Sequence, residues 1–294
     1  MKNIVRFFIS VVIGSAVLFS STLNVHSGVL GDINADGEVG LQEAIYALQV
    51  VAGMKPQLPD FTGTYNFSEQ YDLNISNGVA LGLGYVILEV TQIDANNLSL
   101  QGTVTNPDEG TFSFQFPLVV SGNTATLPAH PYPIPDGSGN LLELLLLSDG
   151  NNMVYTGIGQ EHDDLSDISL SVANWLRTPK PVTVEAFVGT WNGVFYSDPN
   201  LRDTTGGFEV SSESGTIAKV DDDTISVTIR GEPFLFDVAN GRAALANAPV
   251  TSTSAVYHAI SIVTDGSGLS GYMVATELND PADVSVTVGL MRQQ

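Results

Sequence analysis

The chain contains no cysteine and few basic residues. Without cysteine it has no disulfide, no thiolate nucleophile, no Cys-ligated metal and no Cys-linked lipid anchor. Its 10 Lys and Arg residues face 32 Asp and Glu residues, which gives a net charge of −22. Such a chain repels nucleic acids and anionic lipid surfaces, so neither is an expected partner. Beyond the first residues, no apolar run is long enough to span a membrane.

Only 14% of the residues are charged, whereas 43% are hydrophobic and 29 are glycine, a composition typical of a β-rich globular protein. Residues 1–27 resemble a secretory signal, with Lys2 and Arg6 before a short apolar segment and Val25-His26-Ser27 at the expected cleavage site. A membrane anchor is the alternative, but the apolar segment is short for a span. We therefore expect a secreted protein, periplasmic or extracellular, with no membrane span after signal removal.

The stretch "GDINADGEVGLQE" matches the calcium-loop pattern D-x-[DN]-x-[DN]-G-x5-E. Alternate residues of a tight loop can direct their oxygens at one Ca²⁺ ion, and a glycine permits the turn. Gly37 stands at the turn position, and Glu38 would offer its backbone carbonyl. The predicted ligands are Asp32, Asn34, Asp36, Glu38 and Glu43.

A helix is predicted over residues 41–52, with Gly53 as its C-cap. The loop followed by one helix, "GDINADGEVGLQEAIYALQVVAG", resembles a single dockerin type I repeat, an EF-hand-type module, over about 25 residues. The resemblance implies docking on a cohesin-like partner and an association with polysaccharide degradation. The family usually carries two repeats, and this chain has one. The apolar face of the helix must therefore pack on the protein itself, on a second copy or on a partner.

Beyond the linker "KPQLPD", the chain repeats itself. "FTGTYN" at residue 61 is answered by "FVGTWN" at residue 187, and "QIDANNLSLQG" by "KVDDDTISVTIRG". "EHDDLSDISLSV" and "ELNDPADVSVTV" align without a gap at an offset of 116 positions. Both copies alternate apolar and polar residues in short runs split by turns. The sequence predicts a signal peptide at 1–27, the dockerin-like module at 28–56 and β domains at 57–180 and 181–294.

Each copy is predicted to form an antiparallel β-barrel or sandwich of six to eight strands. Gly189-Thr190-Trp191 on a first strand, with Arg292 on the last, resembles the lipocalin (calycin) signature. In that family the tryptophan packs across the barrel base under a late arginine. The resemblance implies that Trp191 and Arg292 are structural, with Tyr65 and Arg177 as their counterparts in the first copy.

No catalytic motif is found, so we expect a protein that is not an enzyme. The histidines are dispersed, without metal-ligand spacing. Acidic groups at 161–167 and 277–283 share the pattern E-x-[DN]-D-x-x-D. An inherited acidic turn is the favoured interpretation, and a second ion site is the alternative. The loop 129–139 lengthens the first copy, and Tyr132 in it is a candidate for ligand stacking.

The sequence thus predicts a secreted, non-catalytic, calcium-binding protein that is mainly β, with a docking or structural calcium module. One alternative is a carrier of a small apolar ligand in a barrel cavity. Another is an accessory or hydrolytic protein of polysaccharide degradation, which rests on the dockerin association alone.

Overall fold

The computed structural model describes residues 60–293 with short gaps, together with residues 44 and 48. The gaps comprise residues 68–69, 75–77, 83–84, 95, 107–109, 130, 134–138, 163, 178–181, 202–206 and 230. The signal segment and calcium loop lie outside the described residues. Within the predicted helix 41–52, only Ala44 and Leu48 are described; both are helical and exposed. Among the described residues, no helix is long and apolar enough to span a membrane.

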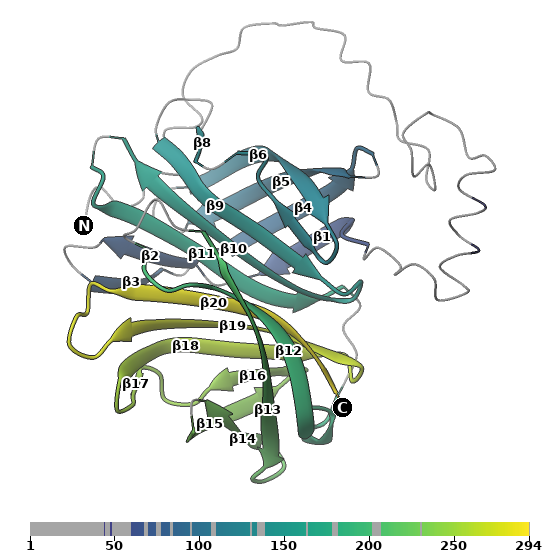
Figure 1. Cartoon of the computed structure of the whole chain (residues 1–294), viewed down its shortest axis with the longest axis vertical. Helices are drawn as coiled ribbons and strands as arrows, with labels where there is room; N and C mark the ends of the chain where they lie inside the picture. The colour runs from purple at the N-terminus through teal and green to yellow at the C-terminus, as the bar shows by residue number, and fades with distance from the viewer. Residues whose placement is uncertain are drawn as a thin grey trace, which may run out of the picture.

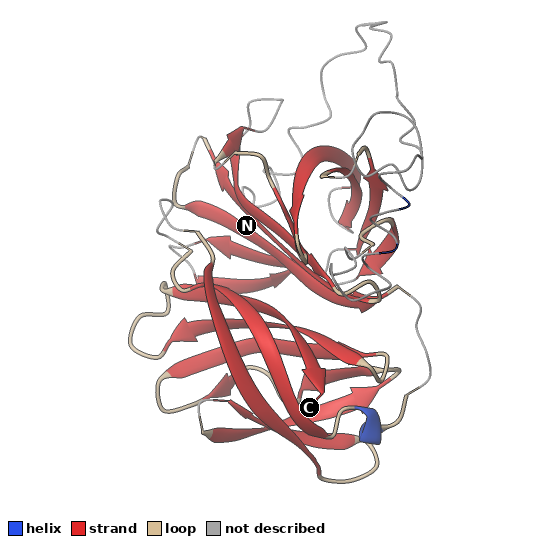
Figure 2. Ribbon diagram, turned by 45° about the vertical axis from the view of Figure 1, so that its right-hand side comes forward, coloured by secondary structure: helices blue, strands red, loops and turns tan. Residues whose placement is uncertain are grey.

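The described chain forms two antiparallel β-sheets that lie against each other (Figure 1). The first contains the strands up to Leu176, and the second begins at Gly189. The 3₁₀ turn η1 (Val184–Ala186) precedes the second sheet, and Figure 2 draws it as the blue helix beside that sheet. The predicted mainly-β fold with two tandem antiparallel domains is confirmed.

The second sheet closes into an eight-stranded barrel. Its strands follow chain order around the barrel, and closure comes from pairing of β16 with β18 and of β12 with β20. The strands are β12 (Gly189–Asp198), β13 (Glu209–Lys219), β14 (Thr224–Ile229), β15 (Glu232–Ala239), β16 (Arg242–Leu245), β18 (Ala255–Thr264), β19 (Gly268–Glu277) and β20 (Val284–Gln293), with the short β17 (Val250–Thr251) beside β18. Up-and-down order needs only short connections, which the turn-rich sequence supplies.

The first sheet has the same strand order, but no hydrogen-bonded pairing among its described residues closes it. Its counterpart of β12 is split, because β1 pairs only with β4 whereas β2 pairs with β11 and β3. The strands are β1 (Gly63–Phe67), β2 (Gln70–Asn74), β3 (Gly78–Gly82), β4 (Tyr85–Gln92), β5 (Asn97–Asn106), β6 (Gly110–Ser121), β7 (Thr124–Thr126), β8 (Tyr132–Pro133), β9 (Gly139–Ser148), β10 (Asn152–Glu161) and β11 (Asp167–Leu176). Of the two predicted forms, barrel or sandwich, the second domain is a closed barrel and the first is a part-barrel.

Strand alternation separates the interior of each domain from its outer face. In β15, Phe234 and Phe236 are buried and Leu235 is exposed. β9 departs from this pattern, since nearly all of its residues are buried. Leu144 and Leu146 face the interior of the first domain, whereas the neighbouring leucines join the second domain.

The two domains share a continuous apolar core between them. The outer faces of β9, β10 and β11 pack on those of β19 and β20, joining side chains that include Leu145, Leu147, Ile158, Leu170, Val274 and Val286. Asn174, fully buried, donates to the backbone oxygens of Ser261 at 2.9 Å and Ser270 at 3.1 Å. Buried polar groups must find partners, so these bonds fix the position of one sheet on the other. The two copies thus form one packed unit.

Candidate functional site

Tyr65 and Trp191 hold equivalent positions near the start of β1 and β12. The Tyr65 hydroxyl donates to the carbonyl oxygen of Phe61 at 2.7 Å, and Nε1 of Trp191 donates to that of Phe187 at 2.7 Å. Both rings are about 1% exposed. Burial raises the pKa of Tyr65 to about 12, so the phenol keeps its donor proton. The tyrosine hydroxyl of the first copy and the indole N–H of the second copy therefore make equivalent hydrogen bonds, each to the carbonyl oxygen of the phenylalanine four residues earlier.

Arg177 lies beside Tyr65 in the first domain, as the resemblance to the lipocalin signature implied. Its guanidinium donates to the Thr62 carbonyl oxygen and to the Tyr65 hydroxyl at 3.3 Å, and it forms an ion pair with Asp60 at 2.7 Å. Tyr65 also stacks at a tilt on Trp175, with ring centroids 4.6 Å apart. These contacts tie the last strand of the domain to the segment that precedes its first strand.

Arg292 does not cover Trp191, and that prediction is wrong. The residue opposite Trp191 on β20 is Gln293, whose Nε2 donates to the Val188 carbonyl oxygen at 3.2 Å. Gln293 is thus the counterpart of Arg177. Side chains alternate along a strand, so Arg292 lies on the outer face of the barrel, where it is exposed. A shift of one residue in the alignment of the two copies caused the error, because it transfers the side chain to the opposite face.

A cavity of about 660 Å³ occupies the second barrel. Trp191 lies at its wall, and its apolar lining includes Phe195, Ile217, Ile262, Met273 and Met291. The polar side chains of the lining are mostly serine and threonine, among them Ser197, Ser211 and Thr287, with Glu213 as the charged one. This volume and mixed lining are typical of small-molecule sites.

Glycines on the inner wall leave room for this cavity. A β-carbon at Gly289 would lie 2.5 Å from the Phe195 ring, and one at Gly193 would lie 2.7 Å from it. The ring can therefore lie flat against the sheet instead of filling the interior. Gly271 is a third glycine on the cavity wall. Small residues at inward positions are the local reason that this barrel is hollow.

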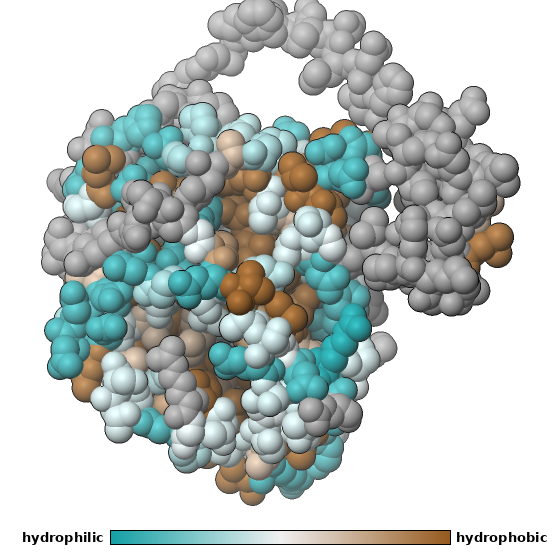
Figure 3. Space-filling view, in the orientation of Figure 1, coloured by the Kyte–Doolittle hydropathy of each residue, from teal (hydrophilic) through white to brown (hydrophobic). Residues whose placement is uncertain are grey.

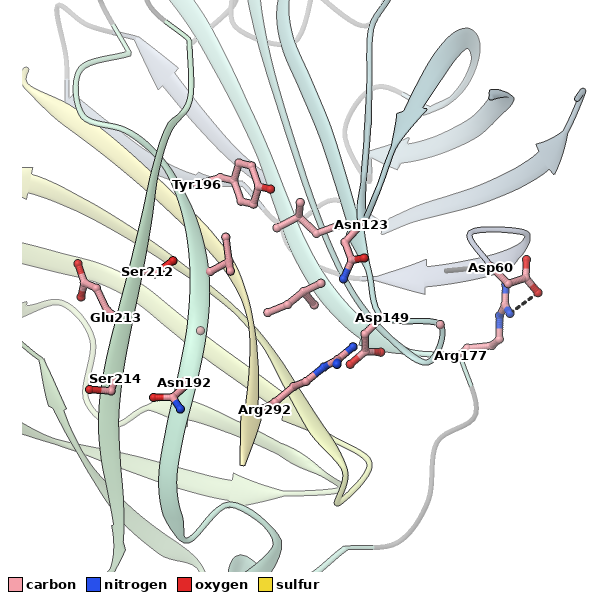
Figure 4. Close-up of a pocket in the computed structure, with 15 residues that line it drawn as sticks. Asp60, Asn123, Asp149, Arg177, Asn192, Tyr196, Ser212, Glu213, Ser214 and Arg292 are labelled. Carbon is pink, nitrogen blue, oxygen red and sulfur yellow. Dashed lines mark hydrogen bonds and ion pairs between the residues drawn. The ribbon is translucent and has the colours of Figure 1, made fainter. Parts of the chain in front are cut away.

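A second, more polar hollow of about 1360 Å³ lies between the domains (Figure 4). Figure 4 shows Arg292 of β20 pointing toward Asp149 of the first domain, while Tyr196, Ser212 and Ser214 come from β12 and β13. We call this hollow the interdomain cleft. Its width and mixed charges suit a water-filled groove better than an enclosed ligand site.

Glu143 is a buried acid at the junction of the domains. It is 8% exposed, Oε2 has no hydrogen-bond partner among the described residues, and the buried Asp198 of β12 lies on the opposing domain. Burial and, next, the charge of Asp198 raise the pKa of Glu143 to about 7. A bulge in β9 accompanies this position, because Glu143 pairs with Ile158 and Leu141 pairs with the next residue, so that Leu142 has no partner.

The predicted calcium ligands lie outside the described residues, so no geometry bears on them. The acidic groups at 161–167 and 277–283 are turns in the structure. Oδ1 of Asp164 accepts from the amide of Ser166, and Oδ1 of Asp280 accepts from that of Ala282. These matched bonds support the inherited-turn interpretation. Tyr132 packs edge-on against Phe116, at 6.2 Å between ring centroids, and is part of the core of the first domain.

Sequence reasoning missed the interface and Glu143. The signal was the run "LLELLLL", which is apolar at consecutive positions and therefore typical of a strand buried on both faces. An acid within such an apolar run is expected to be buried, and burial raises the pKa of its carboxyl group.

No family model matches the chain, and no curated protein does. Among solved structures, a DUF3598-family protein of unknown function from Nostoc punctiforme is 11% identical, with 80% of this chain and 96% of that chain covered and a TM-score of 0.37. A putative outer membrane protein from Bacteroides fragilis is 11% identical over 79% and 97%, with a TM-score of 0.28. Transferrin binding protein B from Neisseria meningitidis is 10% identical over 81% and 78%, with a TM-score of 0.25. Likenesses this distant carry no argument about function, which has to come from the cavities.

Proposed function

We propose that this protein is exported and binds a small, largely apolar ligand in the barrel of its second domain, without catalysing a reaction. The observation that carries the proposal is the cavity of about 660 Å³ lined by Trp191 and other apolar side chains. The hydrogen-bonded strands that make up most of the barrel wall keep it rigid, so little ordering accompanies binding. Glu213 is the one described carboxylate in the lining, so the cavity lacks the paired acids that glycoside hydrolysis uses.

The test compares two neighbouring serines of β13. Ser211 lines the barrel cavity, and Ser212 lines the interdomain cleft, because alternate side chains face opposite sides of the sheet. Ser211→Trp places an indole in the cavity opening, whereas Ser212→Trp adds the same group outside it. Titration with cis-parinaric acid, a fluorescent fatty acid, should give saturable binding to the parent chain.

We expect Ser211→Trp to weaken that binding at least tenfold and Ser212→Trp to leave it within about twofold, because a large side chain removes volume from one hollow only. Equal binding by both variants would place the ligand outside the barrel. Loss in Ser212→Trp alone would assign it to the interdomain cleft. Either result would overturn the proposal.

We further propose that Asp32, Asn34, Asp36, Glu38 and Glu43 bind one Ca²⁺ ion. What supports this is the match of "DINADGEVGLQE" to the calcium-loop spacing. In that arrangement Glu43 binds through its carboxylate and Glu38 through its backbone carbonyl. Calorimetry should therefore show at least a tenfold loss of calcium affinity for Glu43→Ala, and little change for Glu38→Ala. Unchanged affinity in Glu43→Ala would contradict the loop assignment. Calcium-dependent association in light scattering would favour docking, and a constant mass would favour a structural clip.

A further inference from the structure

One edge of β13 is open over most of its length. β13 pairs with β12 from Glu209 to Ile217, whereas β14 pairs only with its last three residues, Ile217–Lys219. Among the described strands, none pairs with the other edge of residues 209–216. We call this segment the open edge. All eight of its residues are exposed, and Figure 1 shows β13 as a long strand at the front of the molecule.

Apart from the charged side chains of Glu209 and Glu213, the open edge lacks the features that usually protect such strands. Edge strands avoid pairing with other chains by being short or by carrying lysine, proline or a covering element. The open edge reads "EVSSESGT", which contains neither lysine nor proline. In antiparallel pairing, alternate residues direct their N–H and C=O groups to the free side, so about four residues can pair with an added strand.

The two faces of the open edge differ in chemistry. Glu209, Ser211 and Glu213 pair with residues of β12 that lie on the same face of the sheet as Trp191. Their own side chains therefore face the interior of the barrel. Val210, 61% exposed, lies on the cleft side, and so does Val194 of β12, which is 42% exposed. Figure 3 shows apolar surface within the hollows of this face. The barrel side of the edge carries two acids, whereas the cleft side carries Val210 followed by the hydroxyl residues Ser212, Ser214 and Thr216.

We propose that the open edge binds an extended polypeptide segment by strand addition, and that every second residue of this segment is basic. Its backbone pairs with the free N–H and C=O groups of residues 209–216. Basic side chains lie beside Glu209 and Glu213, because opposite charges on adjacent strands attract. The intervening side chains of the segment lie on the cleft side, beside Val210 and the hydroxyl groups of Ser212 and Ser214. The chain's net charge of −22 favours a cationic partner over an acidic one.

The test uses the full chain and a fluorescein-labelled peptide of eight alternating lysines and valines, with its ends acetylated and amidated. Two further peptides keep the side chains but carry N-methyl groups, one on the lysine amides and the other on the valine amides. An added strand directs only one of these two sets of amides at β13. We expect one methylated peptide to lose binding at least tenfold and the other to bind within about threefold of the parent peptide.

Glu213→Lys should weaken binding of the parent peptide at least tenfold. Glu89→Lys, the same charge change at an exposed position of β4, should change it less than threefold. Equal binding of both methylated peptides would show attraction by charge alone and would overturn strand addition. So would absence of binding. A doubled mass in light scattering without peptide, lost in Ser214→Pro, would assign the open edge to a second copy of this chain and would also overturn the proposal.

Discussion

Replacing Glu143 by glutamine should stabilise the protein at neutral and alkaline pH. The carboxyl group is 8% exposed, and Oε2 has no hydrogen-bond partner among the described residues. Its pKa is raised from 4.5 to about 7 by burial and then by Asp198. The folded state therefore holds the proton more tightly than the unfolded chain does. The stability that this group contributes is complete below about pH 4.5 and is lost as the pH rises through about 7.

The magnitude follows from the two pKa values. The interval from 4.5 to about 7, at about 1.4 kcal/mol for each pH unit, gives an upper bound of roughly 3.5 kcal/mol for the loss at pH 8. Water penetration and local relaxation reduce the penalty of a buried charge, so about 1–2 kcal/mol is the expected gain for Glu143→Gln. The amide is isosteric with the protonated acid, and so the two chains should be equally stable at pH 4.

The assay is urea denaturation of both chains at pH 4, 5.5, 7 and 8. Comparing the two at each pH cancels the many other carboxylates of this acidic chain. The difference in free energy of unfolding should be near zero at pH 4 and should grow in favour of Glu143→Gln up to pH 8. Asp198→Asn provides the matched variant, because removing that charge should move the transition of Glu143 to lower pH. A difference that is independent of pH, or a less stable glutamine variant at pH 8, would refute the reasoning.

Three further substitutions test the packing. Asn174→Ala removes two donated bonds and one accepted from Ser261 Oγ at 3.1 Å, so it should cost about 2–4 kcal/mol in urea denaturation. Asn151→Ala, a half-buried residue of the same interface, should cost about 1 kcal/mol, and equal costs would contradict the central role of Asn174. Trp191→Phe leaves the Phe187 carbonyl oxygen without its 2.7 Å donor and should lower stability by about 1–3 kcal/mol, whereas an unchanged melting curve would show that this bond contributes nothing.

The sequence predicted local features well. Period-two alternation and turn residues indicated antiparallel strands, because both depend on neighbours in the chain. The aligned turns provide an example. Oδ1 of Asp149 accepts from the amide of Asn152, and Oδ1 of Asp265 accepts from that of Gly268, at the same offset of 116 positions that aligns the two copies. The equivalence of Tyr65 and Trp191 was also evident, since both follow Gly-Thr at the start of a copy.

Features that depend on distant pairing could be settled only by the tertiary structure. Whether a sheet closes depends on its first and last strands, which lie about a hundred residues apart, and so one copy forms a closed barrel and the other does not. Arg292, by contrast, was assigned to the wrong face through an alignment shifted by one residue, because the offset of 116 positions pairs Arg177 with Gln293. The raised pKa of Glu143 exists because an opposing domain buries it.

By itself, then, the sequence determined the strands, the turns and the duplication, because these follow from interactions between near neighbours in the chain. The tertiary structure decided which faces meet, which barrel is hollow and which edge of β13 is open. Those outcomes depend on side-chain volume and backbone pairing summed over segments that are remote in the sequence, such as Gly289 beneath the ring of Phe195.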